Sequence, residues 1–257
     1  MKKWLSIIAL SAMVSTAAYA DFVRVEMGAG AFMAEPSGDI NYDVNGIVDT
    51  VNVKDTLGYS SESMPYLWLN IKHPIPVLPN LRLEYVNVNS SGNSGSFSWE
   101  GNPVPTGTKS ELTLTQYDAV LYYNLLDNTF WTTLDLGLDV KMIQSNYTIA
   151  PQIGFGGYAG YNESKDVVVP MAYLRGRVEI PATNFGFEAD VKYIGDGTSE
   201  ISDIRLKADY TLDFVPVVQP ALEVGYRIQK FKLQDNSNDV KTDLNYSGVY
   251  VGLMLRF

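Results

Sequence analysis

The sequence contains 257 residues, of which 46% are hydrophobic, 12% aromatic and 19% charged, with no cysteine, one histidine and a formal net charge of −10. This content of Tyr, Phe and Trp excludes a disordered chain, and the lack of cysteine excludes disulfides, thiolate metal sites and cysteine nucleophiles. A negative chain binds DNA or RNA poorly, because that binding depends on Lys and Arg contacts to phosphates. One histidine leaves little material for a histidine metal site or a His-dependent catalytic triad.

The first twenty residues have the features of a secretory signal peptide. Lys2 and Lys3 form a positively charged start, and an apolar stretch over residues 4–14 follows. This stretch is too short to span a membrane. Ala18 and Ala20 then satisfy the small-x-small rule for signal peptidase cleavage.

We therefore expect residues 1–20 to be cleaved and residues 21–257 to form one mature domain. The mature chain has 17 basic and 29 acidic residues, a net charge of −12. No later run approaches the roughly 18 consecutive apolar residues of a spanning helix.

The mature sequence alternates between apolar and polar residues in ten separate runs. In the run over residues 134–142, Leu, Leu, Leu, Val and Met occupy every second position, between Asp, Gly, Asp and Lys. Such alternation predicts β-strands with one apolar and one polar face. The predicted strands cover residues 23–33, 67–72, 81–85, 116–123, 134–142, 168–180, 185–193, 203–214, 222–229 and 249–257.

Long and short connections alternate between these runs. Long polar segments cover residues 35–63, 89–111, 143–167, 195–201 and 230–244, and short turns cover residues 73–80, 126–129, 181–184 and 215–219. All long connections therefore leave one end of the sheet, and both termini lie at the other end. An even number of strands with short periplasmic turns and long external loops is typical of an outer-membrane β-barrel. A soluble ten-stranded barrel or sandwich would show the same alternation.

Three features favour the membrane barrel over the soluble alternatives. The polar faces carry full charges of both signs, and the chain stops on Phe257 at the end of an alternating strand. Aromatic residues gather near strand ends, as in the girdles at membrane interfaces. These aromatic residues are Tyr66, Trp68, Tyr122, Tyr123, Phe130, Trp131, Phe185, Tyr193 and Phe214. The sequence thus predicts an all-β, transmembrane, antiparallel up-and-down barrel of ten strands with five external loops.

Three segments resemble known outer-membrane proteins. The C-terminal sequence VYVGLMLRF resembles the signal that the barrel-assembly machinery recognises, at Tyr250, Val251, Leu253, Leu255 and Phe257. The stretches HPIPVLPN at 73–80 and YYNLLDNTFW at 122–131 resemble a family of proteobacterial outer-membrane β-barrels of unassigned function. This resemblance covers the mature chain but supplies no catalytic residue. It implies a location in the outer membrane of a Gram-negative bacterium.

The resemblance also implies partners. The secretion translocon and the barrel-assembly machinery would act during biogenesis. Outer-membrane lipid and lipopolysaccharide would surround the finished barrel. No nucleic acid is expected as a partner, and the sequence identifies no surface ligand.

The ionisable residues, sorted by strand face, give a nearly neutral interior: eleven basic and twelve acidic residues face inward, whereas the five long segments sum to −9. Because unpaired buried charges are costly, this balance predicts ion pairs that bridge a narrow lumen. Side chains just fill an eight-stranded barrel, so we expect a largely closed lumen, with a narrow ion leak as the alternative. The predicted lumen residues are Arg24, Glu26, Lys72, Arg82, Glu84, Asp118, Asp135, Asp139, Lys141, Arg175, Arg177, Glu179, Glu188, Asp190, Lys192, Asp203, Arg205, Lys207, Asp209, Asp213, Glu223, Arg227 and Arg256.

Other candidate sites are weak. His73 is the only imidazole and falls in a predicted periplasmic turn, so we interpret it as a turn residue. Residues 41–46 (NYDVNG) have the spacing that opens a calcium loop, but position twelve is Asn52 where such loops carry Glu. We expect no catalytic residue, cofactor or specific metal site.

The leading functional hypothesis is a non-enzymatic outer-membrane protein whose acidic external loops mediate surface contacts or strengthen the envelope. The segment 35–63 carries six acidic residues and one basic residue, which favours a cationic or ion-bridged partner. The alternative is a porin-like narrow channel for ions or small solutes. A barrel-type membrane enzyme is a third hypothesis, disfavoured by the missing histidines.

Overall fold

The computed structural model describes residues 23–44, 46–75, 77–99, 101–151, 159–212, 218–235 and 240–257. The predicted signal peptide and its cleavage residues Ala18 and Ala20 lie outside the described residues. Among the described residues, none belongs to a helix long and apolar enough to cross a membrane. The strands are β1 (Arg24–Val44), β2 (Ile47–Asn52), β3 (Glu62–Lys72), β4 (Asn80–Asn93), β5 (Phe97–Trp99), β6 (Asn102–Val104), β7 (Lys109–Thr129), β8 (Thr132–Ile149), β9 (Tyr161–Glu179), β10 (Phe185–Gly195), β11 (Glu200–Thr211), β12 (Gln219–Asp235) and β13 (Val240–Arg256).

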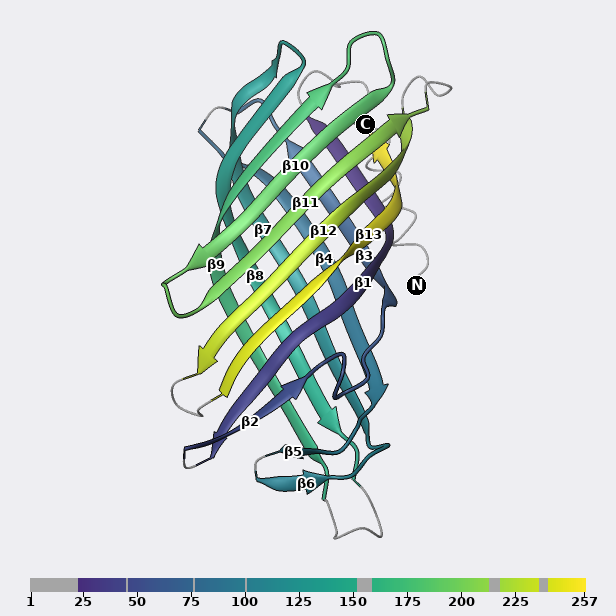
Figure 1. The fold of residues 1–257 in the computed structure, drawn as a ribbon. Helices are drawn as coiled ribbons and strands as arrows, with labels where there is room; N and C mark the ends of the chain where they lie inside the picture. The colour runs from purple at the N-terminus through teal and green to yellow at the C-terminus, as the bar shows by residue number, and fades with distance from the viewer. Residues whose placement is uncertain are drawn as a thin grey trace, which may run out of the picture.

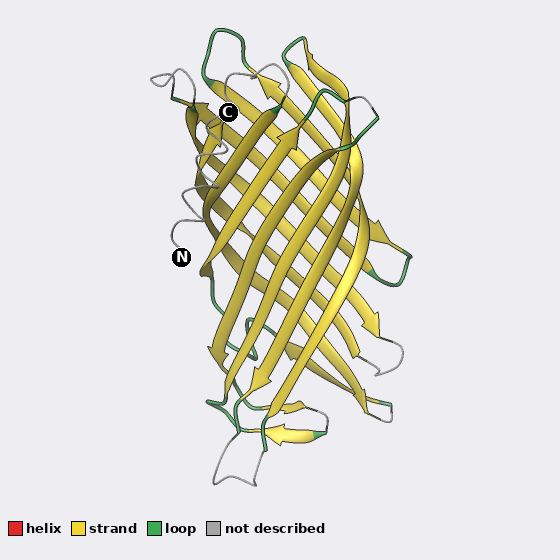
Figure 2. Cartoon of the chain, turned by 180° about the vertical axis from the view of Figure 1, so that it is seen from behind, coloured by secondary structure: helices red, strands yellow, loops and turns green. Residues whose placement is uncertain are grey.

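Ten of these strands form one antiparallel sheet that closes on itself, in the order β1, β3, β4, β7, β8, β9, β10, β11, β12 and β13 (Figure 1, Figure 2). The sheet closes because β13 pairs with β1, from Glu26 opposite Arg256 to Tyr42 opposite Val240. The predicted ten-stranded antiparallel barrel is therefore confirmed. The additional strand β2 pairs with the end of β1, and β5 and β6 form a separate hairpin at the same end of the barrel.

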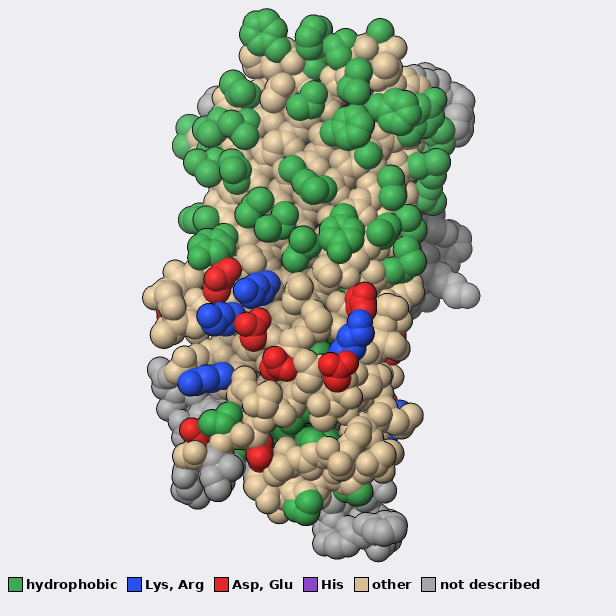
Figure 3. Space-filling view, viewed as in Figure 1, with side chains coloured by type: hydrophobic (Ala, Val, Ile, Leu, Met, Phe, Trp, Pro, Cys, Tyr) green, Lys and Arg blue, Asp and Glu red, His purple; other side chains and the backbone are tan. Residues whose placement is uncertain are grey.

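The outer wall of the barrel carries exposed apolar side chains around the half in which β13 ends, and Figure 3 shows one face of this belt. In β8 the outward positions are Leu134, Leu136, Leu138, Val140 and Met142, and Leu138 is 66% exposed. A strand of about nine to eleven residues crosses a bilayer when it is tilted, so this belt has the height that a membrane requires. Figure 3 also shows charged side chains gathered beyond the belt, toward the end that carries β2, β5 and β6.

Beyond the apolar belt the strands continue, but there the outward face is polar and the inward face is apolar. Further along β8, Gln144 and Asn146 face outward, whereas Ile143, Tyr147 and Ile149 are buried inside. The predicted external loops are thus largely strands, because a strand that leaves the membrane must present polar side chains to water. We call this part the extension. It comprises β2, β5, β6 and the parts of eight barrel strands that lie beyond the belt. These parts are residues 35–44 of β1, 62–63 of β3, 87–93 of β4, 109–115 of β7, 143–149 of β8, 161–167 of β9, 230–235 of β12 and 240–247 of β13.

The extension has a low side. The strands β10 and β11 have 11 and 12 residues, whereas their neighbours β9 and β12 have 19 and 17. The pairing of β9 with β10 ends at Ala172 opposite Tyr193, and the pairing of β11 with β12 ends at Glu200 opposite Lys232. Figure 1 shows the β10–β11 turn part-way along the barrel, while the adjacent strands continue. The wall of the extension is therefore lowest at this turn.

Candidate functional site

Charged side chains fill the lumen at the level of the apolar belt. Of the 23 ionisable residues predicted to face inward, 19 are buried; we call these 19 the lumen network. Arg24, Lys72 and Glu179 are partly exposed at the end of the barrel near the termini, and Asp213 lies outside the described residues. Every second residue of each of the ten strands points into the lumen, so the closed barrel brings these residues together although they are far apart in the sequence.

Glu84 of β4 is the acidic residue at the centre of the lumen network, with 5% of its surface exposed. Its carboxylate contacts four cations from four strands. Their distances are 2.5 Å to Arg82 Nε, 2.8 Å to Lys192 Nζ, 3.4 Å to an Arg205 terminal nitrogen and 3.6 Å to an Arg227 terminal nitrogen. In the ring of ten strands, β11, which carries Arg205, lies five strands from β4 in either direction. These ion pairs therefore bridge the full width of the bore.

A pair of glutamines crosses the bore where the lumen network ends. Gln229 Nε2 donates to Gln116 Oε1 at 2.8 Å, and Gln116 Nε2 donates to Gln229 Oε1 at 3.2 Å. Their strands β7 and β12 are also five apart in the ring, and both side chains are fully buried. Asp203 joins this layer, because it accepts from Gln229 at 3.0 Å and pairs with Arg227 at 2.6 Å.

A second group of ion pairs lies in the half of the lumen nearer the end of β13. Arg175 pairs with Asp135 at 2.6 Å and with Glu188 at 2.7 Å. Arg177 and Arg256 both contact Asp209, at 2.9 Å and 2.5 Å respectively. Each of these side chains bonds to a neighbouring or next-nearest strand, so the group lines the wall and fills the space beside it.

Three aromatic residues predicted to belong to the interface girdles lie inside the lumen. Tyr66, Trp68 and Tyr122 are at most 4% exposed, so this part of the girdle prediction is wrong. Trp68 Nε1 donates to Glu223 at 3.1 Å, and the Tyr66 hydroxyl donates to the same carboxylate oxygen. The Trp68 ring also lies 4.8 Å from both the Arg82 guanidinium and the Lys207 ammonium, so it takes part in the charged layer through cation–π contacts.

The extension encloses an apolar cavity of about 780 Å³, which we call the mouth cavity. Its aromatic lining comes from Tyr42, Trp99, Tyr147, Tyr161 and Phe231, and β1, β7, β8, β9, β12 and β13 add aliphatic side chains. The polar residues of the lining are Ser145, Glu163, Lys165, Ser199, Gln234 and Thr242. The rings pack around Trp99, whose centroid lies 5.2 Å from that of Tyr147 and 5.4 Å from that of Tyr161. The sequence pattern gives no sign of this cavity, because Trp99 comes from the β5–β6 hairpin and its position depends on contacts between segments far apart in the sequence.

The β10–β11 turn at the low side of the extension is held by Asp196. Its carboxylate accepts from the Ser199 backbone amide at 2.7 Å and from the Thr198 amide and hydroxyl at 2.9 Å and 2.8 Å. These hydrogen bonds, those from the backbone first, lower the pKa of Asp196 to about 2 from its usual 3.8.

This pKa predicts an acid-labile turn. Because the folded pKa lies below the usual value, the ionised carboxylate stabilises the turn above about pH 4, and this stabilisation is lost as the pH falls toward 2. Hydrogen exchange at the Thr198 and Ser199 amides should therefore lose protection over this range. Asp196→Asn, which has no charge to lose, should show no such step. A step of equal size in Asp196→Asn would contradict this assignment.

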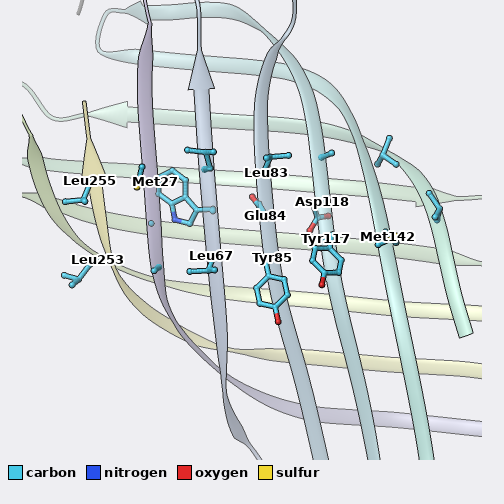
Figure 4. Close-up of a pocket in the computed structure, with 17 residues that line it drawn as sticks. Met27, Leu67, Leu83, Glu84, Tyr85, Tyr117, Asp118, Met142, Leu253 and Leu255 are labelled. Carbon is cyan, nitrogen blue, oxygen red and sulfur yellow. The ribbon is translucent and has the colours of Figure 1, made fainter. Parts of the chain in front are cut away.

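A hollow on the outer wall lies on the apolar belt (Figure 4). Its volume is about 880 Å³, and Met27, Leu67, Leu83, Leu253 and Leu255 are among the side chains that line it. Small outward residues such as Ala29 and Ala119 lie among these larger ones, which explains the depression. Its lining is mainly apolar, as on a lipid-facing surface. Tyr85 and Tyr117 also line it, and Glu84 and Asp118 border it while their carboxylates pair with cations in the lumen.

The remaining candidate residues lie apart from the lumen and the mouth. His73 belongs to the β3–β4 turn, where its ring Nε2 is 3.0 Å from the Pro79 carbonyl. Residues 41–52 contain a β-hairpin in which Asn41 accepts from Thr50 and Asp43 from the Gly46 amide, each at 2.7 Å. Among the residues that the structure describes, no group of three or more His, Asp or Glu side chains is arranged to hold a metal ion.

The predicted assembly signal forms the end of β13. Val251, Leu253 and Leu255 face outward and are 44%, 62% and 36% exposed. Tyr250 points inward, with its ring centroid 5.3 Å from that of Tyr66. Phe257 hydrogen-bonds through its backbone to Val25 and so completes barrel closure. The recognition of this segment by the assembly machinery stays a prediction.

A closed antiparallel barrel with an apolar outer belt and a charged interior is the fold of the outer-membrane β-barrel proteins. No protein-family model matches the sequence, and no curated protein matches it. The structure is similar to that of the outer membrane protease OmpT from Escherichia coli, with a TM-score of 0.51, 10% sequence identity, and coverage of 92% of this chain and 96% of OmpT.

Two other solved barrels match with lower TM-scores. The transport unit of the autotransporter AIDA-I from Escherichia coli gives a TM-score of 0.41 at 11% identity, covering 91% of this chain and 89% of that chain. Neisserial surface protein A gives a TM-score of 0.31 at 10% identity, covering 91% of this chain and 97% of that chain. At these identities the likeness extends to the fold alone.

Proposed function

We propose that this chain is a non-conducting outer-membrane β-barrel protein of a Gram-negative bacterium that presents an acidic extension at the cell surface. The observation that carries this proposal is the pair of contacts across the bore, Glu84 with Arg205 and Gln116 with Gln229. Each pair joins strands on opposite sides of the ring, so side chains occupy the path that a solute would take.

The polarity of the wall supports the orientation. The apolar belt suits the membrane, and the short turns, the start of β1 and the end of β13 lie at the opposite end from the extension (Figure 1), as in outer-membrane barrels with periplasmic turns. Because the chain has no cysteine, single-cysteine variants report one position each. Val48→Cys in β2 should react on whole cells with a membrane-impermeant maleimide, whereas Thr183→Cys in a short turn should react only after the outer membrane is permeabilised. The reverse pattern would overturn the orientation, and equal labelling would overturn the location.

The charge of the extension favours contact with cations or with ion-bridged lipopolysaccharide. The segment 35–63 has a net charge of −5, and only Glu35 among its six acidic residues pairs with its single base, Lys54. Like charges repel, so contact with anionic lipopolysaccharide would need a bridging divalent ion. Binding of the protein in nanodiscs to lipopolysaccharide vesicles should therefore require Mg²⁺. Replacing Asp43, Asp49 and Asp55 by Asn should weaken it, and binding that persists unchanged in EDTA would overturn this role.

We also propose that the protein is not an enzyme. The only imidazole, His73, lies in a turn at the end of the barrel opposite the extension, and the lumen carboxylates are held in ion pairs with Arg and Lys. Neither arrangement provides a base beside a nucleophile in an open cleft. Release of fatty acids from phospholipid, or of peptides from a denatured protein, by the reconstituted barrel would overturn this proposal.

A further inference from the structure

The mouth cavity combines three properties of a small-molecule site. Its volume of about 780 Å³ falls within the range of roughly 300–1,000 Å³ for ligand pockets, and the mouths of β-barrels are a common location for them. It is lined mainly by aromatic and aliphatic side chains. It also lies on the extension side of the glutamine pair that crosses the bore, because its lining residues Leu114 and Phe231 lie beyond Gln116 and Gln229, toward the extension, on the same two strands.

We propose that the mouth cavity binds a small uncharged compound that carries an aromatic ring and a hydrogen-bond acceptor. This inference does not depend on whether the lumen conducts.

The aromatic lining favours a ring over an aliphatic chain. Trp99 is packed against Tyr42, Tyr147 and Tyr161 at centroid distances of 6.2 Å, 5.2 Å and 5.4 Å, with interplanar angles of 29°, 56° and 68°. Aromatic pairs gain from offset-stacked and edge-to-face geometry beyond the area they bury. A planar ring in the cavity would extend this arrangement, whereas a hydrocarbon chain would gain only from burial.

The indole N–H of Trp99 favours a ligand that carries a hydrogen-bond acceptor. Trp99 is 5% exposed, and its indole N–H has no hydrogen-bond partner among the described residues. Buried Trp N–H groups usually find a partner, because an unsatisfied donor costs free energy. A carbonyl or ether oxygen on the ligand would supply that partner.

The charge of the lining favours a neutral ligand. Glu163 and Lys165 are the charged residues among those that line the mouth cavity, and they contribute one charge of each sign. The Glu163 carboxylate already accepts from the Tyr161 hydroxyl. A net charge on the ligand would therefore enter an apolar site with no matching excess charge, which is unfavourable.

The low side of the extension provides the entrance. Ser199, in the β10–β11 turn, lines the cavity together with Val167 of β9 and Leu233 of β12. At this level the outer wall changes from apolar to polar, from Val168 to Asp166 on β9. An aromatic compound concentrated at the membrane surface would reach the cavity over this turn.

Photolabelling with benzophenone tests the proposal on the unaltered chain. Benzophenone is neutral, has two rings and a carbonyl acceptor, and on irradiation it attaches to C–H bonds that it contacts. In the barrel reconstituted in nanodiscs, we expect saturable labelling of the peptides that contain residues 161–167 and 231–233. Labelling that is confined to lipid-facing positions and rises linearly with concentration would overturn the proposal.

Competition tests the ligand class. Excess acetophenone, a neutral ring with a carbonyl group, should abolish the saturable labelling, whereas the same concentration of dodecanoate should leave it. Equal competition by dodecanoate would overturn the assignment to a neutral aromatic compound. Because mapping and competition use the unaltered chain, they decide the proposal even where a variant does not fold.

Two variants test the residues. Val167→Trp, which fills the cavity, should reduce the saturable labelling about tenfold, whereas Val168→Trp on the outward face of the same strand should leave it unchanged. Trp99→Phe keeps a ring but removes the donor, so the half-saturating concentration should rise about fivefold. An unchanged half-saturating concentration in Trp99→Phe would overturn the role of the indole N–H.

Discussion

Replacing Glu84 by glutamine is expected to lower the free energy of unfolding by about 3–5 kcal/mol, the cost of removing one partner from a buried ion pair. The carboxylate contacts Arg82, Lys192, Arg205 and Arg227, and all four cations are at most 3% exposed. Without the negative charge these cations would repel one another in a site that water does not reach. Urea titration of the protein refolded in phospholipid vesicles measures the change.

Glu111→Gln is the matched control for this substitution. Glu111 also pairs with a lysine, Lys109, at 2.6 Å, but its side chain is 50% exposed in the extension. Exposed ion pairs contribute little, so this variant should change the free energy of unfolding by less than about 0.5 kcal/mol. Equal losses in the two variants would show that burial of the lumen network contributes nothing, and would contradict our account.

Replacing Leu138 by arginine is expected to cost about 2–4 kcal/mol, the cost of an arginine near the bilayer midplane on the lipid face of a barrel. Leu138 is the middle of the five outward apolar residues of β8 and is 66% exposed to the surroundings of the barrel. The measurement is again equilibrium unfolding in phospholipid vesicles.

The same substitution eight residues further along β8 provides the comparison. Asn146 faces outward like Leu138 but lies in the extension, where the surroundings are aqueous. Asn146→Arg should therefore be close to neutral. A similar cost at both positions would mean that the membrane boundary does not lie between Met142 and Gln144.

The transmembrane part of the fold could be predicted from the sequence because lipid imposes a simple rule on it. Every outward residue must be apolar, so residues such as Leu134, Leu136 and Leu138 mark the strand and its two faces. The same rule places Glu84 and Arg205 inside, since they alternate with leucines and other apolar residues. The ion pairs that these residues form across the bore could not be predicted from the sequence, because side-chain contacts between opposite strands depend on the register and shear of the barrel.

The extension was missed because the alternation continues there in the opposite phase. In β7, Tyr117 and Ala119 face outward in the belt, but Leu112 and Leu114 face inward in the extension. The change of phase coincides with the membrane boundary and breaks the periodic pattern, so a continuous strand resembled a polar loop. A search for alternation in either phase would have extended both β7 and β8.

The position of Trp68 could also have been read from its phase. Leu67 and Leu69 face outward, so Trp68 between them must face inward with Asn70. Tryptophan is common at the membrane interface, but the alternation of side chains along a strand determines which way this residue points. Gly28 lies opposite Trp68 in the adjacent strand and leaves the space that the indole occupies. The mouth cavity gave no such signal, since it forms from strand ends and a hairpin far apart in the sequence.

Conductance across a planar lipid bilayer is the most direct test of the closed lumen. The refolded barrel, shown to be inserted and folded, should give no reproducible conductance steps, because Glu84, Arg205, Gln116 and Gln229 block the bore from opposite sides. Reproducible steps from the unaltered chain, changed in size or ion selectivity by neutralising Asp135 or Arg175, would contradict the closed lumen and establish a narrow channel in its place.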